Sequence, residues 1–302
     1  MTPATVNRQF VLTKCAFFLQ VQIWPLHQKM NPELWLSNFN ADEMPHALAL
    51  LNAFVYFSQE MMEALFLSAF QSLSATMRPD NEPFVATQAK WRQFVDTVIF
   101  TCVRGEHPNV TDSGFHFLRM ARQTLKIEQS RILEPASALE LMVRDGPRPI
   151  VFVDDFVGSG RQFVTTWRRE IGILSARQTI SFERYAKSVR GTQFLYCPLI
   201  CTQFGRDAIT KACPEVLLCP AHVLSRDYSA FASDSNVWPP SLAPSAQSFI
   251  ETASARAGIA PADVRGFNNL GLSLAFEHSV PDATLPIFYW NENGWKPLIE
   301  RR

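Results

Sequence analysis

Two adjacent carboxylates, Asp154 and Asp155, precede the tripeptide Gly158-Ser159-Gly160 by only a few residues. Glycine allows positive φ angles and lets a ligand approach the backbone closely, and Ser159 adds a hydroxyl group. If a helix begins just after the tripeptide, its free backbone amides favour an anion such as a phosphate. These residue types in this order therefore indicate a ligand site that places an anion beside two acids.

A strand and a helix must position these groups. Ile150 to Val153 contains β-branched and aromatic residues without polar alternation, which is typical of a strand buried on both faces. A helix is predicted from Arg161 to about Leu174. Ligands of an open α/β sheet bind beyond the carboxyl ends of its strands. We therefore expect Asp154 and Asp155 to lie at a site and not in a core.

Further strands are predicted on either side of this segment, at Thr97 to Val103, Phe194 to Cys201 and Val216 to Cys219. Helical segments alternate with them, and one is predicted from Phe204 to Ala212. Such alternation predicts an α/β fold with a mainly parallel sheet flanked by helices.

A second polar segment, Arg104-Gly105-Glu106, directly follows the strand predicted to end at Val103. A strand, a glycine-containing polar loop and a capped helix would form a second corner that faces the ligand. An ordinary surface loop would have the same sequence. The residues leave both interpretations open.

Three parts of the chain differ in composition. Residues 1–29 are expected to be a dispensable extension, because Met30-Asn31-Pro32 resembles an ordinary start of a protein. Residues 30–96 are rich in helical spacing and are predicted to form a helical N-terminal part. Residues 97–302 are predicted to form the α/β domain, with strands near the C-terminus that close the sheet.

Composition excludes several classes of protein. The 302 residues are 47% hydrophobic, and 28 basic residues balance 28 acidic ones. The chain therefore has no overall positive charge that would favour non-specific binding to nucleic acid or a membrane, although the balance permits a local basic patch. The six cysteines contain no C-x-x-C pair, which is typical of free thiols in a reducing cytoplasm. No apolar run reaches the roughly 20 residues that span a bilayer.

Two common nucleotide motifs do not fit the central segment. A dinucleotide-binding loop needs a third glycine at Phe163, and a P-loop needs lysine at Arg161. A third motif fits better, because residues 154–160 resemble the D-P-F-x-G-S-G sequence with which amino-methylating DNA methyltransferases hold S-adenosylmethionine. Asp155 replaces its proline, however, and Trp238-Pro239-Pro240 lacks the flanks of the second motif of that family.

The segment Val151 to Gly160 resembles the type I phosphoribosyltransferases more closely, in a buried strand, two adjacent acids and a small-residue loop that opens a helix. The chain is most similar to a divergent branch, the phosphoribosyltransferase-like domain of prokaryotic conflict (antiphage and retron-type) systems. Trp35-Leu36-Ser37-Asn38-Phe39, Leu270-Gly271-Leu272 and Trp295-Lys296-Pro297-Leu298 also carry this similarity. The resemblance implies a type I phosphoribosyltransferase-like α/β fold with an N-terminal helical extension.

The resemblance also implies roles for individual residues. Asp154 and Asp155 would hold the ribose hydroxyls, and Mg²⁺ would bridge those hydroxyls and a pyrophosphate. Arg104, Gly105 and Glu106 would occupy the place of the pyrophosphate loop. The 5′-phosphate would lie on the residues Val157, Gly158, Ser159, Gly160 and Arg161.

The expected function is binding of a ribose-5-phosphate compound, either phosphoribosyl diphosphate or a nucleotide, by an effector of a prokaryotic defence system. A defence-system protein or a nucleic acid would be its macromolecular partner. An active enzyme of this kind would transfer a pentosyl group or cleave a glycosidic bond. Two alternatives stay open: a non-catalytic nucleotide sensor or partner-binding module, and an S-adenosylmethionine-dependent methyltransferase.

Overall fold

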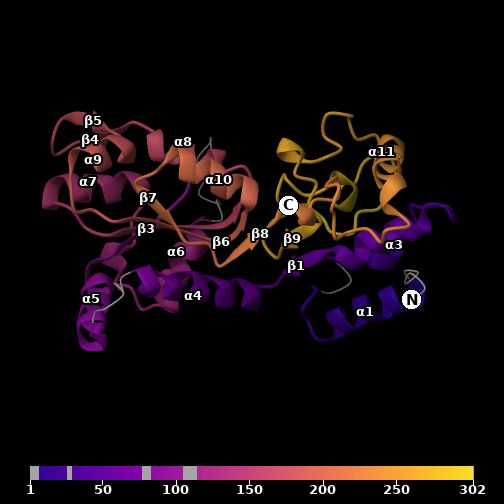
Figure 1. Cartoon of the computed structure of the whole chain (residues 1–302), viewed down its shortest axis with the longest axis horizontal. Helices are drawn as coiled ribbons and strands as arrows, with labels where there is room; N and C mark the ends of the chain where they lie inside the picture. Colours follow the sequence, from indigo (N-terminus) through magenta and orange to yellow (C-terminus); the bar gives the residue numbers. More distant parts are fainter. Residues whose placement is uncertain (1–6, 26–28, 77–82, 105–113, 302) are drawn as a thin grey trace. The chain divides into compact units, whose positions relative to one another are not determined.

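The computed structural model describes residues 7–25, 29–76, 83–104 and 114–301 (Figure 1). The chain forms two compact units. One unit contains Met62–Val223, and the other combines Met1–Met61 with Leu224–Arg302. This division differs from the expected boundary after residue 96, because the helices just before that residue belong to the first of these units. Within the described residues, no helix is long and apolar enough to cross a bilayer.

The unit Met62–Val223 is built on a mainly parallel sheet. Its strands lie in the order β2 (Ile99–Cys102), β3 (Ile150–Val157), β6 (Phe194–Thr202) and β7 (Val216–Leu218). All three neighbouring pairs are parallel. A short strand, β8 (His222–Leu224), also pairs with β6. The predicted α/β class and parallel sheet are therefore confirmed.

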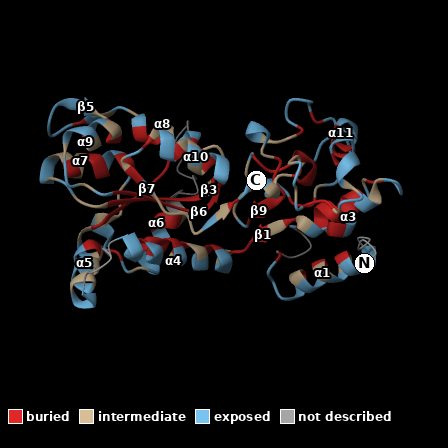
Figure 2. Ribbon diagram, in the orientation of Figure 1, coloured by how far each residue is buried: buried red, intermediate tan, exposed pale blue. Residues whose placement is uncertain are grey.

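Helices cover both faces of this sheet, as the apolar strands require. The residues of β2 and β6 are all buried (Figure 2). Phe152 of β3 packs on the face that contains α8, whereas Phe100 of β2 packs against Phe70 of α4 on the other face. One layer consists of α7 (Pro135–Asp145), α8 (Arg161–Arg168), α9 (Phe182–Ser188) and α10 (Gln203–Ala212), and the opposite layer of α4 (Gln59–Thr76), α5 (Phe84–Thr97) and α6 (Gly114–Gln123).

The prediction of one helix from Arg161 to about Leu174 is wrong at its C-terminal end. The helix α8 stops at Arg168, and Ile171–Ile173 forms strand β4, which pairs antiparallel with β5 (Gln178–Ile180). The sequence Ile171-Gly172-Ile173 explains the change, because glycine and β-branched residues disfavour helix.

The second unit joins the two ends of the chain. It contains α1 (Arg8–Gln20), α2 (Pro32–Leu36), α3 (Met44–Ala53), β1 (Val55–Phe57), α11 (Ala246–Ala257) and β9 (Leu274–Phe276). Strand β9 pairs in parallel with β1 in a separate two-stranded sheet, and it does not close the main sheet as the sequence predicted. Five short 3-10 turns complete the described elements: Gln129–Arg131, Arg226–Tyr228, Ala243–Ser245, Phe267–Asn269 and Pro286–Phe288.

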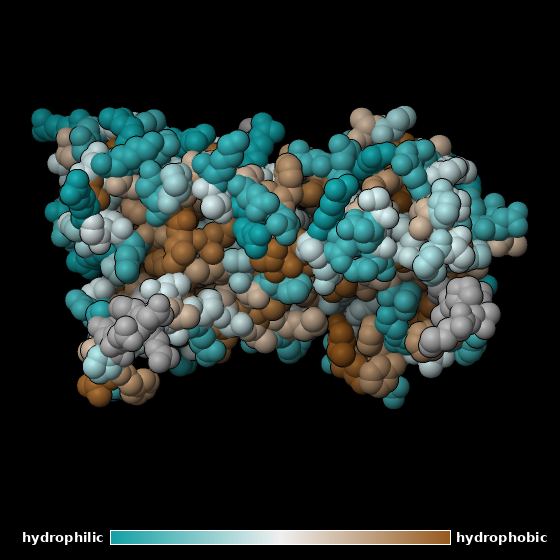
Figure 3. All heavy atoms as spheres, in the orientation of Figure 1, coloured by the Kyte–Doolittle hydropathy of each residue, from teal (hydrophilic) through white to brown (hydrophobic). Residues whose placement is uncertain are grey.

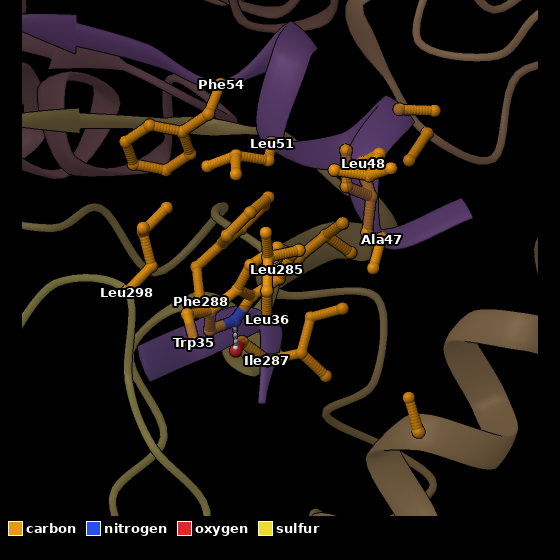
Figure 4. Packing of buried hydrophobic residues seen from close by; sticks show 14 of the residues in the cluster. Trp35, Leu36, Ala47, Leu48, Leu51, Phe54, Leu285, Ile287, Phe288 and Leu298 are labelled. Atoms are coloured by element: carbon orange, nitrogen blue, oxygen red, sulfur yellow. Dashed lines mark hydrogen bonds between the residues drawn. The ribbon is translucent and has the colours of Figure 1, made fainter. Parts of the chain in front are cut away.

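Aromatic packing fixes this union of the two ends. The ring of Trp35 stacks on Phe288, and its Nε1 donates to the carbonyl of Ile287 at 2.8 Å (Figure 4). Trp295 donates to the same carbonyl at 2.9 Å. Leu51 of α3 lies in the same cluster as Phe288. The C-terminal residues therefore complete a core that the N-terminal helices begin.

Candidate phosphosugar site

Strand β3 carries both acids near its carboxyl end. The strand continues to Val157, so Asp154 and Asp155 lie within its last residues and not just beyond them. On one side, β2 pairs with β3 only as far as Val153. On the other side, β6 pairs with β3 as far as Val157. The acids therefore lie beyond the paired end of β2, while β6 still supports their backbone.

The two carboxylates are nearly buried, with residue exposures of 4% for Asp154 and 8% for Asp155. Oδ1 of Asp154 accepts the backbone N–H of Asp155 at 3.0 Å, and Oδ1 of Asp155 accepts that of Phe156 at 2.8 Å. The Tyr196 hydroxyl donates to Oδ2 of Asp154 at 2.8 Å. Hydrogen bonds of this kind are what buried carboxylates require.

Burial changes the acidity of this cluster. Burial, followed by the neighbouring Asp155 carboxylate, raises the pKa of Asp154 well above that of an ordinary carboxyl group. Burial, followed by the Asp154 charge, likewise raises the pKa of Tyr196. Two adjacent acids in one buried site thus favour a shared proton until a ligand or a cation compensates their charge.

The Gly158-Ser159-Gly160 loop lies between two helix N-termini. Gly160 has φ +75° and precedes α8 directly, in a backbone conformation that favours glycine. A side chain at Gly205, in the first turn of α10, would place Cβ 2.5 Å from the Gly158 carbonyl oxygen. The loop and the start of α10 are therefore in direct contact.

Thr202 connects these two elements. Its Oγ1 accepts the Gly205 N–H at 2.9 Å as the N-cap of α10, and its hydroxyl donates to the carbonyl of Gly158. Two helix N-termini thus converge on one small loop. Their backbone amides and dipoles favour an anion there.

The start of the predicted pyrophosphate loop is fixed to α8. The Thr166 hydroxyl donates to the Arg104 carbonyl at 3.1 Å, and its Oγ1 accepts the backbone N–H of Arg104 at 3.3 Å. The Arg104 guanidinium pairs with Glu134. Arg104 therefore begins its loop beside the helix that follows the glycines. Gly105 and Glu106 lie outside the described residues.

Sequence reasoning found the acids and the glycine loop but missed the residues that support them, which are Tyr196, Thr202, Gly205 and Thr166. Tyr196 had a weak signal, as a polar hydroxyl in the otherwise apolar strand β6. Thr202 and Gly205 had another, as an N-cap residue and a glycine at the junction of strand and helix. Nothing in the sequence connects Thr166 with Arg104.

The donor set suits a hard cation only in part. The described part of the chain contains no group of three or more His, Cys, Asp or Glu side chains that could hold a metal ion. Asp154 and Asp155 offer carboxylate oxygens, which Mg²⁺ prefers. Since Mg²⁺ usually keeps several waters and binds substrate oxygens, two carboxylates fit an ion that takes its other ligands from the substrate.

Comparison with known families decides the assignment of the chain. The family model PRTase-CE matches residues 32–301. The chain belongs to the PRTase-CE family. This match supports a phosphoribosyltransferase-like α/β protein, in agreement with the parallel sheet described above. The PRTase-CE match extends over most of both units and begins after α1. No curated protein matches the chain.

Proposed function

We propose that this PRTase-CE protein binds a ribose-5-phosphate compound, either phosphoribosyl diphosphate or a nucleotide, together with Mg²⁺ at the carboxyl end of β3. One observation carries the proposal. The buried pair Asp154 and Asp155 is followed within one strand-to-loop segment by Gly158–Gly160, which directly precedes α8 and contacts the first turn of α10.

The chemistry of the ligand matches the two halves of the site. Ribose has two vicinal hydroxyls, which donate hydrogen bonds, and adjacent carboxylates accept them. The 5′-phosphate is an anion, for which loop amides at helix N-termini are suited. Asp154 and Asp155 would therefore orient the sugar while the glycine loop holds its phosphate.

An active enzyme would use the same groups. The acids would hold the ribose ring in place as the bond at its anomeric carbon breaks and positive charge develops on the sugar. Asp154 and Asp155 would hold Mg²⁺ together with the ligand, and the ion would supply charge neutralisation for a departing pyrophosphate. Transfer of a pentosyl group or cleavage of a glycosidic bond is the reaction class that this arrangement supports. Binding without turnover would identify a sensor.

The binding test is a calorimetric and thermal-shift comparison of phosphoribosyl diphosphate with Mg²⁺, ribose 5-phosphate, AMP and S-adenosylmethionine. A ligand that binds only the native state raises the melting temperature by mass action. We expect stabilisation by the phosphorylated ribose compounds in the wild type. In the Asp154→Asn, Asp155→Asn double variant we expect the affinity to fall by about tenfold or more, as for hydrogen bonds to charged groups.

The matched control is Asp42→Asn with Asp234→Asn, which changes two exposed acids outside the site in the same way. It should bind like the wild type. Unchanged affinity of the Asp154, Asp155 variant would remove these acids from the site. Stabilisation by S-adenosylmethionine alone would favour the methyltransferase alternative.

We also propose that the protein acts as an effector in a prokaryotic defence system. The support for this role is the similarity of its terminal and central motifs to the conflict-system branch of these domains. Expression of the wild type together with its neighbouring genes should reduce phage plaque numbers. The Asp154→Asn, Asp155→Asn variant should not. Equal protection by both would separate the defence role from the acid pair.

A further inference from the structure

The segment that follows the glycine loop is strongly basic. Between Arg161 and Arg190 it has seven basic residues and two acidic ones, a local charge of 7 − 2 = +5 in a chain with 28 of each. Six of the seven are arginine, whose planar guanidinium matches phosphate oxygens in bidentate geometry. The seven are Arg161, Arg168, Arg169, Arg177, Arg184, Lys187 and Arg190.

These residues belong to one layer of the structure. Helix α8, the hairpin β4–β5 and helix α9 all lie on the side of the sheet that also carries α7 and α10 (Figure 1). We call the exposed side of residues 161–190 the α8–α9 basic surface. Hydrophilic side chains cover this part of the molecule in the view of Figure 3. A charged surface with few apolar side chains suits a polyanion better than the apolar core of a protein interface.

Its two acidic residues pair with three of the seven basic side chains and leave a net positive charge on the segment. Glu183 of α9 lies 3.7 Å from Arg168 of α8 and 3.0 Å from Lys187. Glu170 pairs with Arg184 at 3.3 Å. These ion pairs connect the end of α8 with α9. Because seven basic residues face only two acidic ones, the α8–α9 basic surface keeps a net positive charge.

Helix α8 connects this surface with the candidate site. It begins at Arg161, directly after Gly160, and ends at Arg168. Its eight residues cover about 12 Å at 1.5 Å per residue. The side chains of Val164, Thr165, Arg168 and Arg169 line a shallow concave area on the helix. A strand that leaves the phosphate loop along α8 would therefore meet basic side chains.

We propose that the α8–α9 basic surface binds single-stranded RNA, with the 3′-terminal nucleotide in the candidate site. This inference rests on the proposed function. The acid pair accepts two vicinal hydroxyls, and in an RNA strand only the 3′-terminal nucleotide has both of them free. DNA has no 2′-hydroxyl. The phosphate that joins this nucleotide to the preceding one lies at the glycine loop, and the strand continues over α8.

The test measures fluorescence anisotropy with a 5′-labelled RNA of about 12 nucleotides, a length within the usual site sizes for single strands. Two variants remove charge from the surface: Arg168→Gln with Arg169→Gln at the concave area, and Arg177→Glu with Arg190→Glu at its outer part. The matched control, Arg92→Glu with Lys126→Glu, reverses two exposed charges outside the surface, one in α5 and one three residues after the end of α6.

We expect each surface variant to weaken RNA binding by about tenfold at low salt. The slope of the logarithm of affinity against the logarithm of salt concentration should become shallower by about 0.7 for each RNA phosphate that the variant no longer neutralises. The control variant should bind within about twofold of the wild type. Equal weakening in the control, or no RNA binding by the wild type, would overturn the proposal.

A second comparison tests the position of the RNA end. RNA with a 2′,3′-dideoxy terminus and DNA of the same sequence should both bind more weakly than RNA with a free 3′-terminal diol. Equal binding of all three would overturn the placement of the 3′ end. Calorimetry with ribose 5-phosphate on the surface variants separates the phosphosugar-site hypothesis from the RNA-binding hypothesis. If these variants bind both ribose 5-phosphate and RNA like the wild type, the RNA proposal is refuted and the phosphosugar site is not.

Discussion

Tyr196 connects the acid pair with the helix that follows the glycine loop. Its hydroxyl donates to Asp154, and its ring stacks on Phe163 of α8 with centroids 4.0 Å apart and an interplanar angle of 11°. The side chain is nearly inaccessible, at 1% exposure. We infer that Tyr196 positions the Asp154 carboxylate and acts on the ligand only through it.

Tyr196→Phe removes this donor and keeps the ring. The hydrogen bond from Tyr196 lowers the pKa of Asp154 against the larger opposing effects of burial and Asp155. Without it, the pKa of Asp154 rises further. Since the ionised carboxylate accepts the ribose hydroxyls, binding should strengthen as the pH rises through this pKa. The variant should bind about fivefold more weakly, as expected when one hydrogen bond is removed, and its binding profile should move to higher pH.

Calorimetric titration with ribose 5-phosphate over a range of pH checks this prediction. Tyr185→Phe is the matched control, because it removes a buried tyrosine hydroxyl that donates to the Met142 carbonyl at 3.0 Å, outside the site. The control should lose some stability and keep the wild-type pH profile. A Tyr196→Phe profile that coincides with the wild type would refute the positioning role.

The packing of helix α10 against the glycine loop depends on Gly205. Gly205 lets the first turn of α10 approach the end of β3 and the loop. A Cβ at this position would lie 2.5 Å from the Gly158 oxygen and 2.7 Å from Cγ1 of Val157. Alanine normally favours helix over glycine by about 1 kcal/mol. The close approach should reverse that preference.

Gly205→Ala should therefore lower the stability of the protein by about 1–3 kcal/mol, the range for overpacked sites, and should also weaken binding of ribose 5-phosphate. Thermal denaturation and calorimetry measure the two effects. Gly172→Ala in β4 is the control, since no atom outside its chain neighbours lies within 4 Å of the Cβ it would add. Equal melting temperatures for the two variants would show that the glycine loop can move to accommodate the added Cβ without a loss of stability.

The elements that sequence predicted well are those with a long uniform pattern. Ile150 to Val153 is apolar throughout, and Phe194 to Cys201 is apolar except for the Tyr196 hydroxyl; such runs indicate strands of a parallel sheet buried on both faces. The hairpin β4–β5 was missed because its strands have three residues each. The acids and glycines of the site are adjacent in sequence and were found. Tyr196 and Thr202 act across the strand pair β3–β6, which no local pattern reveals.

The whole molecule is organised around two units that each have their own core. The family match begins at residue 32, after α1. Nevertheless, α1 contributes Val11, Cys15 and Leu19 to the core of its unit. Lys14 of α1 donates to the carbonyl of Asn52 at the end of α3, at 2.7 Å. The expectation that residues 1–29 are dispensable therefore needs a direct test.

A chain that starts at Met30 should be less stable than the full chain, because α1 and Trp24 bury apolar side chains worth about 1.5–3 kcal/mol each. We expect a lower melting temperature and increased binding of a hydrophobic dye. A chain that lacks only residues 1–6 keeps α1 and is the control. Identical melting curves for the Met30 chain and the full chain would show that the extension is dispensable.

The union of both chain ends in one core also has a consequence for synthesis on the ribosome. Trp35 and its hydrogen-bond partner Ile287 are 252 residues apart in sequence. At about 5–20 residues per second, translation needs roughly 10–50 s to cover that separation. Residues 62–223 emerge in the meantime as one uninterrupted stretch, and they form the other compact unit. Nascent α1 to α3 must wait for the last residues, and during that delay their apolar side chains are natural clients for a chaperone.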